Sequence, residues 1–245
     1  MLAVPGTAAA DEAGIGPAVA STAGLSCPGV DIRVGYLEGD EASLSECLAG
    51  AGREAGDQDQ FPSVIVPLLL SPSPRIDPAL RRAATEPAVS AVLAAHLGPH
   101  PLVAEALHAR LAEAGLARHA RASGLSISAD SRGIVVLADA GEDAVSAAAV
   151  AAVLLASRLS VPVVPASLGD PASIVNAVDR LSQSGAQRPV LAPCLIGPEI
   201  SAAVLDDLSA ALSAPCAPML GAHQAIGQLV AIRYGAALAS LSLAG

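Results

Sequence analysis

The side chains best suited to chemistry stand where predicted strands end. Glu38 follows an apolar strand at Val30–Leu37, and His100 and His223 each follow a strand and begin a helix. Carboxylates and imidazoles bind divalent transition metals, and histidine also accepts protons near neutral pH. Each residue has an ordinary alternative, because a loop carboxylate is usually solvated and a histidine can simply occupy a tight strand-to-helix turn. A metal role is therefore one of two interpretations for all three.

A second group of polar side chains follows the apolar run Val64–Leu70, where the loop reads Ser-Pro-Ser-Pro-Arg-Ile-Asp. Three arginines lie in or just after this loop: Arg75, Arg81 and Arg82. Arginine contacts carboxylates in a bidentate manner, so the cluster suits a ligand that carries carboxylates. A solvated helix face is the alternative. Three hydroxyl groups near the same strand ends can hydrogen-bond such a ligand: Thr7, Ser71 and Ser73.

The elements that position these residues alternate between short apolar strands and alanine-rich helices. The predicted strands are Leu2–Val4, Val30–Leu37, Val64–Leu70, Val89–Leu97, Ile134–Ala138, Val161–Ala166, Val190–Ile196 and Cys216–Leu220. The predicted helices are Ala42–Ala51, Leu102–Ala114, Val145–Arg158, Ile174–Ser182, Ala202–Leu212 and Ile226–Ala239. Strands separated by long helices predict an α/β fold with parallel sheets covered on both faces. The carboxyl ends of parallel strands meet at one edge, which is where binding loops gather.

Three matches between the halves indicate an internal duplication. Leu37–Leu48 parallels Ser167–Val178, Val66–Pro72 parallels Ala192–Pro198, and His96–Leu107 parallels Met219–Val230. We therefore expect two flavodoxin-like lobes with a cleft between them, each a mainly parallel four-stranded sheet flanked by helices. The expected boundaries are 1–118 for the first lobe, 119–132 for a linker and 133–245 for the second lobe.

Composition excludes several classes of function. The net charge is −10, all 13 basic residues are arginine, and there are one Phe, two Tyr and no Trp. Without lysine the chain has no Schiff-base chemistry, and without basic patches and aromatic platforms we expect no nucleic-acid partner. The four widely spaced cysteines are expected to be core residues. No basic segment precedes an apolar one, and the longest apolar helix, Ala144–Ser157, is shorter than the ~18 residues of a membrane span. We expect a cytoplasmic protein without a membrane partner.

Four stretches resemble the two-lobed sirohydrochlorin chelatases of the cobalamin and siroheme pathways: RVGYLEGDEASLSECL, VIVPLLLSP, LGPHPLVAEALHARLAEAG and LGAHQAIGQLVAIRYGAAL. The resemblance covers nearly the whole chain and implies insertion of Co²⁺ or Fe²⁺ into sirohydrochlorin, a tetrapyrrole with many carboxylates. It implies no tightly bound cofactor, because the metal ion is a substrate. It also implies that Glu38, in the run Gly35-Tyr36-Leu37-Glu38, is the catalytic residue and a metal ligand.

The chain departs from the family pattern at two positions. Pro5 stands where the family places a histidine, and the loop Ser-Pro-Ser-Pro-Arg-Ile-Asp replaces a second histidine. Two hypotheses follow. Either the protein inserts Co²⁺ or Fe²⁺ with Glu38 and His100 or His223 at the metal, or it is a catalytically degenerate paralogue. The paralogue would bind, carry or sense the tetrapyrrole. A flavin or nucleotide site is disfavoured because no glycine-rich fingerprint follows a strand.

Overall fold

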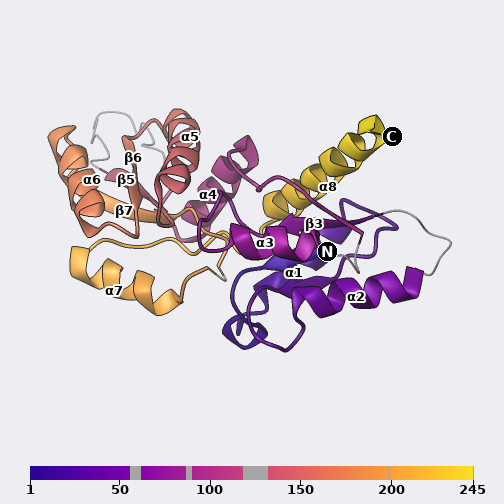
Figure 1. Ribbon diagram of the computed structural model, residues 1–245. Coiled ribbons are helices and arrows are strands. Elements are labelled where there is room, and N and C mark those ends of the chain that lie inside the picture. The colour runs from indigo at the N-terminus through magenta and orange to yellow at the C-terminus, as the bar shows by residue number, and fades with distance from the viewer. Residues whose placement is uncertain (56–61, 87–89, 118–131, 198, 245) are drawn as a thin grey trace. The chain divides into compact units, whose positions relative to one another are not determined.

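The computed structural model describes residues 1–55, 62–86, 90–117, 132–197 and 199–244, which form two parallel sheets flanked by helices (Figure 1). The strands are β1 Leu2–Val4, β2 Val34–Tyr36, β3 Ser63–Pro67, β4 Ala91–Leu93, β5 Arg132–Ala138, β6 Val163–Ser167 and β7 Arg188–Pro193. The helices are α1 Ile15–Gly24, α2 Leu44–Ala55, α3 Asp77–Ala84, α4 Pro101–Glu113, α5 Glu142–Leu159, α6 Pro171–Gln183, α7 Ala202–Leu212 and α8 Gln224–Ala244, with a short 3-10 helix η1 at Ala8–Ala10. The predicted α/β class is confirmed.

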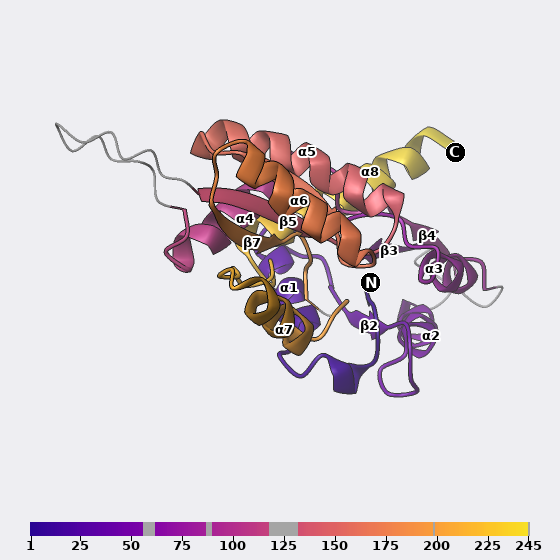
Figure 2. The ribbon, with the colours of Figure 1, turned by 90° about the vertical axis from the view of Figure 1, so that its left-hand side faces the viewer.

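The first sheet joins four parallel strands in the order β2-β1-β3-β4. One face packs on α2 and α3, in a core that includes Ala3, Leu48, Ile65 and Leu80. Figure 2 shows α2 beside β2 and α3 beside β4. Helices α1 and α8 contact each other, and they contact β1 and β3 respectively. Because helices cover the sheet, the strands are apolar along their whole length, as expected for a parallel sheet.

The second sheet joins three parallel strands in the order β6-β5-β7. The prediction of four strands in this lobe is wrong in detail, because the segment Cys216–Leu220 forms only an isolated bridge between Cys216 and Leu191. Pro215 precedes that segment and Pro218 interrupts it, and proline has no backbone N–H to donate to a neighbouring strand. The segment nevertheless runs beside β7, since Ala217 donates to the Leu191 carbonyl at 2.8 Å.

Two helices of the first lobe are absent from the prediction, α1 and α3. The α1 sequence, IGPAVASTAG, contains glycine, proline, serine and threonine, all poor helix formers. Packing stabilises it instead: Val19 and Ala23 are fully buried. A Cβ on Gly16 would lie 3.0 Å from Val4 Cγ2, so glycine permits the close approach of α1 to β1.

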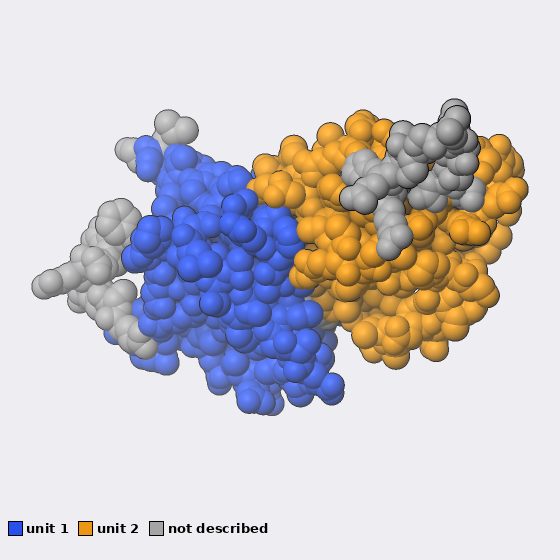
Figure 3. All heavy atoms as spheres, turned by 180° about the vertical axis from the view of Figure 1, so that it is seen from behind, with its two compact units in different colours: residues 1–98, 221–245 blue, residues 99–220 orange. Residues whose placement is uncertain are grey.

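The chain forms two compact units that differ from the continuous lobes expected at 1–118 and 133–245. The first comprises Met1–Gly98 with Gly221–Gly245, and the second comprises Pro99–Leu220 (Figure 3). Helix α4 therefore belongs to the unit of the second sheet, and α8 to the unit of the first. Local sequence patterns predict a helix but not which sheet it covers. The predicted linker 119–132 lies outside the described residues except for Arg132, which begins β5.

Helix α8 is longer and more apolar than the sequence analysis expected. Its segment Gln224–Ser242 has a mean hydropathy of 1.2, and among the described helices it alone has the length and composition to cross a membrane. In the first unit, however, α8 contacts α1 and β3 and buries Ile226, Leu229 and Val230. These contacts bury one part of α8 in the first unit, since 33% of the Gln224–Ser242 segment is buried.

Candidate functional site at the carboxyl edge of the first sheet

Glu38 lies just beyond the carboxyl end of β2, where the backbone is fixed by the turn that follows β1. The Leu37 N–H donates to the Val4 carbonyl and the Glu38 N–H donates to the Gly6 carbonyl, both at 3.0 Å. Gly6 has a φ of +79°, a left-handed conformation that glycine adopts without strain. The sequence Pro-Gly-Thr thus forms the turn that positions Glu38 at the sheet edge.

Arg75 from the loop between β3 and α3 contacts Glu38. Its Nη1 lies 2.7 Å from Glu38 Oε1, and the two side chains are 64% and 51% exposed. From the sequence, Glu38 is predicted to bind a metal ion and Arg75 to bind a carboxylate. The structure places them in one ion pair, at the edge where the strand ends of a parallel sheet gather.

The loop that carries Arg75 is held rigidly. The Ser73 carbonyl accepts from the N–H groups of Ile76 and Asp77, at 3.0 and 2.8 Å. Asp77 is buried, and its Oδ1 accepts from the Ser73 N–H at 3.2 Å and lies 3.0 Å from His96 Nε2. Ile76 is also buried, which anchors the loop in the core. Asp77 is a positioning residue that the sequence analysis missed, although its place at the start of α3 is typical of a helix cap.

A second missed residue, Asp11, supports the strand that precedes Glu38. Asp11 is buried and accepts hydrogen bonds from the N–H groups of Ile15 and Gly16 at the start of α1, at 2.7 and 2.8 Å. Its Oδ2 also accepts from the Tyr36 hydroxyl at 3.0 Å. Burial, this hydrogen bond and the nearby carboxylate charges raise the pKa of Tyr36 to about 12. Tyr36 is therefore a neutral hydrogen-bond donor that joins β2 to α1.

His100 and His223 occupy equivalent helix starts. His100 Nδ1 accepts from the Leu102 N–H at 3.2 Å at the start of α4, and His223 Nδ1 accepts from the Ala225 N–H at 3.1 Å at the start of α8. Their strand-to-helix positions were predicted, and the structure adds that each ring caps a helix through Nδ1. His100 belongs to the second unit, whereas His223 belongs to the first with Glu38.

The remaining predicted ligand-binding residues are placed as follows. Thr7 lies beside the Glu38 turn, because a Cβ on Gly39 would be 3.2 Å from Thr7 Cγ2, and its Oγ1 accepts from the Ala10 N–H at 3.1 Å as the cap of η1. Arg81 lies 3.8 Å from Asp77 Oδ2, and both Arg81 and Arg82 are exposed on α3. Ser71 and Ser73 are partly exposed in the Arg75 loop.

The described residues do not gather a set of metal ligands. Across these ranges, no group of three or more His, Cys, Asp or Glu side chains is close enough to hold one ion. Pro5, at the position where the family resemblance predicts histidine, is buried. The charged groups shown to meet at this edge are the Glu38 carboxylate and the Arg75 guanidinium.

The carboxyl edge of the second sheet carries a carboxylate that is bound to backbone N–H groups. Glu199, after β7, accepts from the N–H groups of Ile196 and Gly197 at 3.1 and 2.6 Å. Removal of this carboxyl from solvent raises its pKa, and the backbone donors oppose that shift. A recess of about 550 Å³ lies beside the starts of α5 and α6 and is lined by small residues, among them Gly141, Ser167 and Gly169. Among the described residues, no arginine lines this recess.

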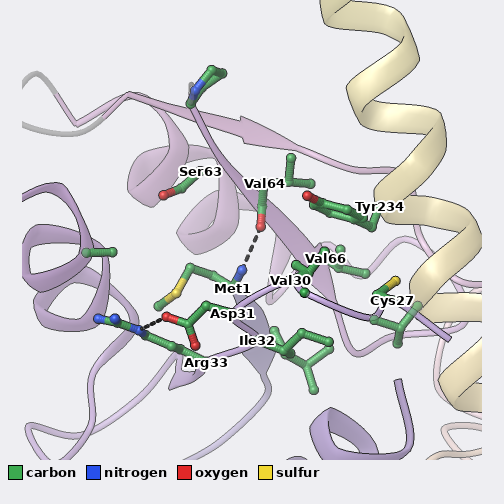
Figure 4. A pocket seen from close by; sticks show the side chains of 15 residues that line it. Met1, Cys27, Val30, Asp31, Ile32, Arg33, Ser63, Val64, Val66 and Tyr234 are labelled. Carbon is green, nitrogen blue, oxygen red and sulfur yellow. Dashed lines mark hydrogen bonds and ion pairs between the residues drawn. The ribbon is translucent and has the colours of Figure 1, made fainter. Parts of the chain in front are cut away.

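A larger pocket, of about 590 Å³, lies at the opposite, amino edge of the first sheet (Figure 4). It is lined by Cys27, the ion pair of Asp31 and Arg33, Ser63 and Tyr234 of α8, together with aliphatic side chains. Burial raises the pKa of the Cys27 thiol, so this cysteine is a weak nucleophile. The pocket is separate from the Glu38–Arg75 edge, because it lies at the strand starts.

Comparison with known proteins identifies the class of this fold. SirB from Bacillus subtilis with Fe³⁺ matches 98% of this chain and 96% of its own, with a TM-score of 0.67 and 17% identity. The sirohydrochlorin chelatase SirB from Bacillus subtilis subspecies spizizenii in complex with cobalt matches 95% and 92%, with a TM-score of 0.61 and 17% identity. The chain thus has the two-sheet fold of the chelatases.

Sequence comparison agrees with the fold. Residues 18–114 match the family model described as CbiX, a segment that contains both Glu38 and Arg75. DR2241 from Deinococcus radiodurans, a multi-domain protein with structural similarity to chelatases, matches 95% of this chain and 54% of its own, with a TM-score of 0.62 and 18% identity. No curated protein matches the sequence. The match to the CbiX model covers the first part of the chain, and the chelatase structures match the fold of nearly the whole chain.

Proposed function

We propose that this protein binds a sirohydrochlorin-type tetrapyrrole at the carboxyl edge of the first sheet and holds it during metal chelation or transfer. The carrying observation is the Glu38–Arg75 pair at 2.7 Å, which puts a carboxylate-binding guanidinium where the family resemblance predicts a histidine. Sirohydrochlorin carries many carboxylates, and arginine is the side chain best suited to them. The match of residues 18–114 to the CbiX family model and the chelatase-like fold support this choice of ligand.

A second candidate function is insertion of Co²⁺ or Fe²⁺ into the bound macrocycle. It is favoured by Glu38, which follows β2 in the run Gly-Tyr-Leu-Glu within the matched segment. Insertion exchanges two pyrrole N–H protons for one divalent ion, and a carboxylate beside the ring accepts such a proton. One general base typically contributes ~10²–10⁴-fold to a rate, so an enzyme that relies on Glu38 alone should be slow.

Absorption spectroscopy separates the two functions. Sirohydrochlorin is titrated with purified protein anaerobically, and Co²⁺ or Fe²⁺ is then added. A spectral shift on binding, with metal insertion no faster than in the protein-free control, supports the binding function. Insertion above the control that is lost in Glu38→Gln but kept in Asp40→Asn supports the enzyme. Absence of any spectral shift on mixing overturns both candidates.

A further inference from the structure

In the Glu38–Arg75 pair, the guanidinium of Arg75 already binds one carboxylate, that of Glu38. A carboxylate of the ligand would compete with Glu38 for the same guanidinium. We infer that Arg75 recognises a carboxylate of the tetrapyrrole, and that Glu38 occupies the place of that carboxylate until the ligand arrives. Ligand binding thus releases Glu38 beside the macrocycle. This inference rests on the proposed function, because it states how the same site selects its ligand and when Glu38 becomes available.

The contact between the two residues leaves room for exchange. It joins one guanidinium nitrogen, Nη1, to one carboxylate oxygen, Oε1. Within the described ranges, neither side chain makes another hydrogen bond or ion pair. A guanidinium has five N–H donors in a planar fork, so this single contact uses little of its capacity. A carboxylate that meets the fork with both oxygens forms a stronger pair.

Exchange requires only the side chains to move. The Glu38 backbone is tied to the Gly6 carbonyl, and the Arg75 loop is tied by Ser73 and by buried Ile76. Both charged groups are more than half exposed. An ion pair in such an exposed setting is weak, so an incoming carboxylate displaces Glu38 without disturbing the fold.

The exchange imposes an order on the site. Before the tetrapyrrole binds, the Glu38 carboxylate is paired with the Arg75 guanidinium. After exchange, a ligand carboxylate pairs with Arg75, and the Glu38 carboxylate is left without its ion-pair partner next to the ring. A macrocycle without carboxylates leaves the pair intact and is not selected.

A double-mutant cycle with uroporphyrin, a tetrapyrrole with eight carboxylates, tests the exchange in the full-length protein. Fluorescence titration at neutral pH gives dissociation constants for wild type, Glu38→Gln, Arg75→Ala and the double variant. Arg75→Ala should weaken binding about tenfold. Glu38→Gln should strengthen binding roughly two- to fivefold, because the internal competitor is gone. When Arg75 is already alanine, that gain should shrink to the size of the gain caused by Asp40→Asn.

Asp40→Asn is the matched control, since Asp40 is an exposed neighbour of Glu38 in the same turn. It removes the same charge without touching Arg75, so any gain it causes should be equal with and without Arg75. The exchange is overturned if Glu38→Gln leaves affinity unchanged, or if its gain is as large in the Arg75→Ala background as in wild type. If wild type binds neither uroporphyrin nor sirohydrochlorin, the proposed function itself fails. Circular dichroism of the same sample shows whether the protein is folded, and so distinguishes a lack of binding from unfolding.

Discussion

Arg233, on the last helix, donates through Nη2 to the main-chain carbonyl of Leu97 at 3.0 Å and thereby ties α8 to the end of the first repeat. An equivalent contact exists in the second unit, where Arg110 of α4 donates through Nε and Nη2 to the Leu220 carbonyl at 3.0 and 2.6 Å. The matched segments His96–Leu107 and Met219–Val230 extend to both arginines in the same register. Arg110 of the first repeat thus contacts a carbonyl of the second unit, and Arg233 of the second repeat contacts a carbonyl of the first unit.

Replacement of Arg110 by methionine should destabilise the second unit. A buried or half-buried carbonyl loses a charged donor, and such hydrogen bonds contribute about 1.5–3 kcal/mol each. Methionine keeps most of the aliphatic stem, so the loss reports on the hydrogen bonds. Urea denaturation followed by circular dichroism measures the change. Glu113→Gln is the control, because it removes only the exposed ion pair with Arg110 and should change stability by no more than ~0.5 kcal/mol.

Two glycines of α8 should respond oppositely to alanine. A Cβ on Gly227 would lie 2.7 Å from Thr22 Cγ2 and 2.9 Å from the Ala23 nitrogen, so Gly227→Ala forces α8 away from α1. We expect a loss of about 1–3 kcal/mol. A Cβ on Gly235 meets no heavy atom within 4 Å, so Gly235→Ala should stabilise the helix by roughly 0.5–1 kcal/mol. Thermal denaturation of both variants checks the prediction, and a shared sign would contradict the packing of α8 on α1.

Tyr36 should make stability fall at alkaline pH. Its pKa in the folded state is about 12, above the value of about 10 for an unfolded chain, so folding favours the neutral phenol. This contribution is fully present below pH ~10 and is lost as the pH rises towards 12. Tyr36→Phe lacks it at every pH. The difference in unfolding free energy between wild type and Tyr36→Phe should therefore shrink between pH 10 and 12, and a constant difference would exclude the Asp11–Tyr36 hydrogen bond.

The Arg75→Ala variant should fold normally. Exposed ion pairs contribute about 0–1 kcal/mol, so loss of the contact with Glu38 costs little. Asp77→Ala should cost more, about 1–3 kcal/mol, since it leaves the Ser73 N–H and the half-buried His96 without their partner. Chemical denaturation of the two variants side by side tests this ranking. An equally large loss in Arg75→Ala would mean that the pair is structural.

Apolar patterns in the sequence were sufficient for the sheets and most helices. The strand Leu2–Val4 and the helix Ala202–Leu212 occur with the predicted bounds. Helix α1 was missed because its stability comes from contacts with α8, more than 200 residues away, and not from its own composition. The segment Cys216–Leu220 was wrongly predicted to be a strand, because the prediction followed its apolar residues and gave too little weight to Pro215 and Pro218.

The candidate site was predictable in part. The order of strands and loops placed Glu38 and the Arg75 loop at one edge, because parallel strands share their carboxyl ends. That the two charges meet depends on loop conformations set by Gly6, Asp77 and Ile76, which no local pattern reveals. The support given by Asp11 to Tyr36 was equally hidden, since it joins residues 25 apart through a buried carboxylate.

The exchange of α4 and α8 between the repeats also governs when the protein can fold. As the chain leaves the ribosome, the first sheet emerges early, but the helix that covers α1 and β3 is translated only after the whole second unit. The nascent first unit must therefore remain incomplete, with apolar surface uncovered, for most of synthesis. The second unit, Pro99–Leu220, is complete before α8 is made, so the unit whose synthesis starts first is the last to be finished, unlike two domains that fold one after the other.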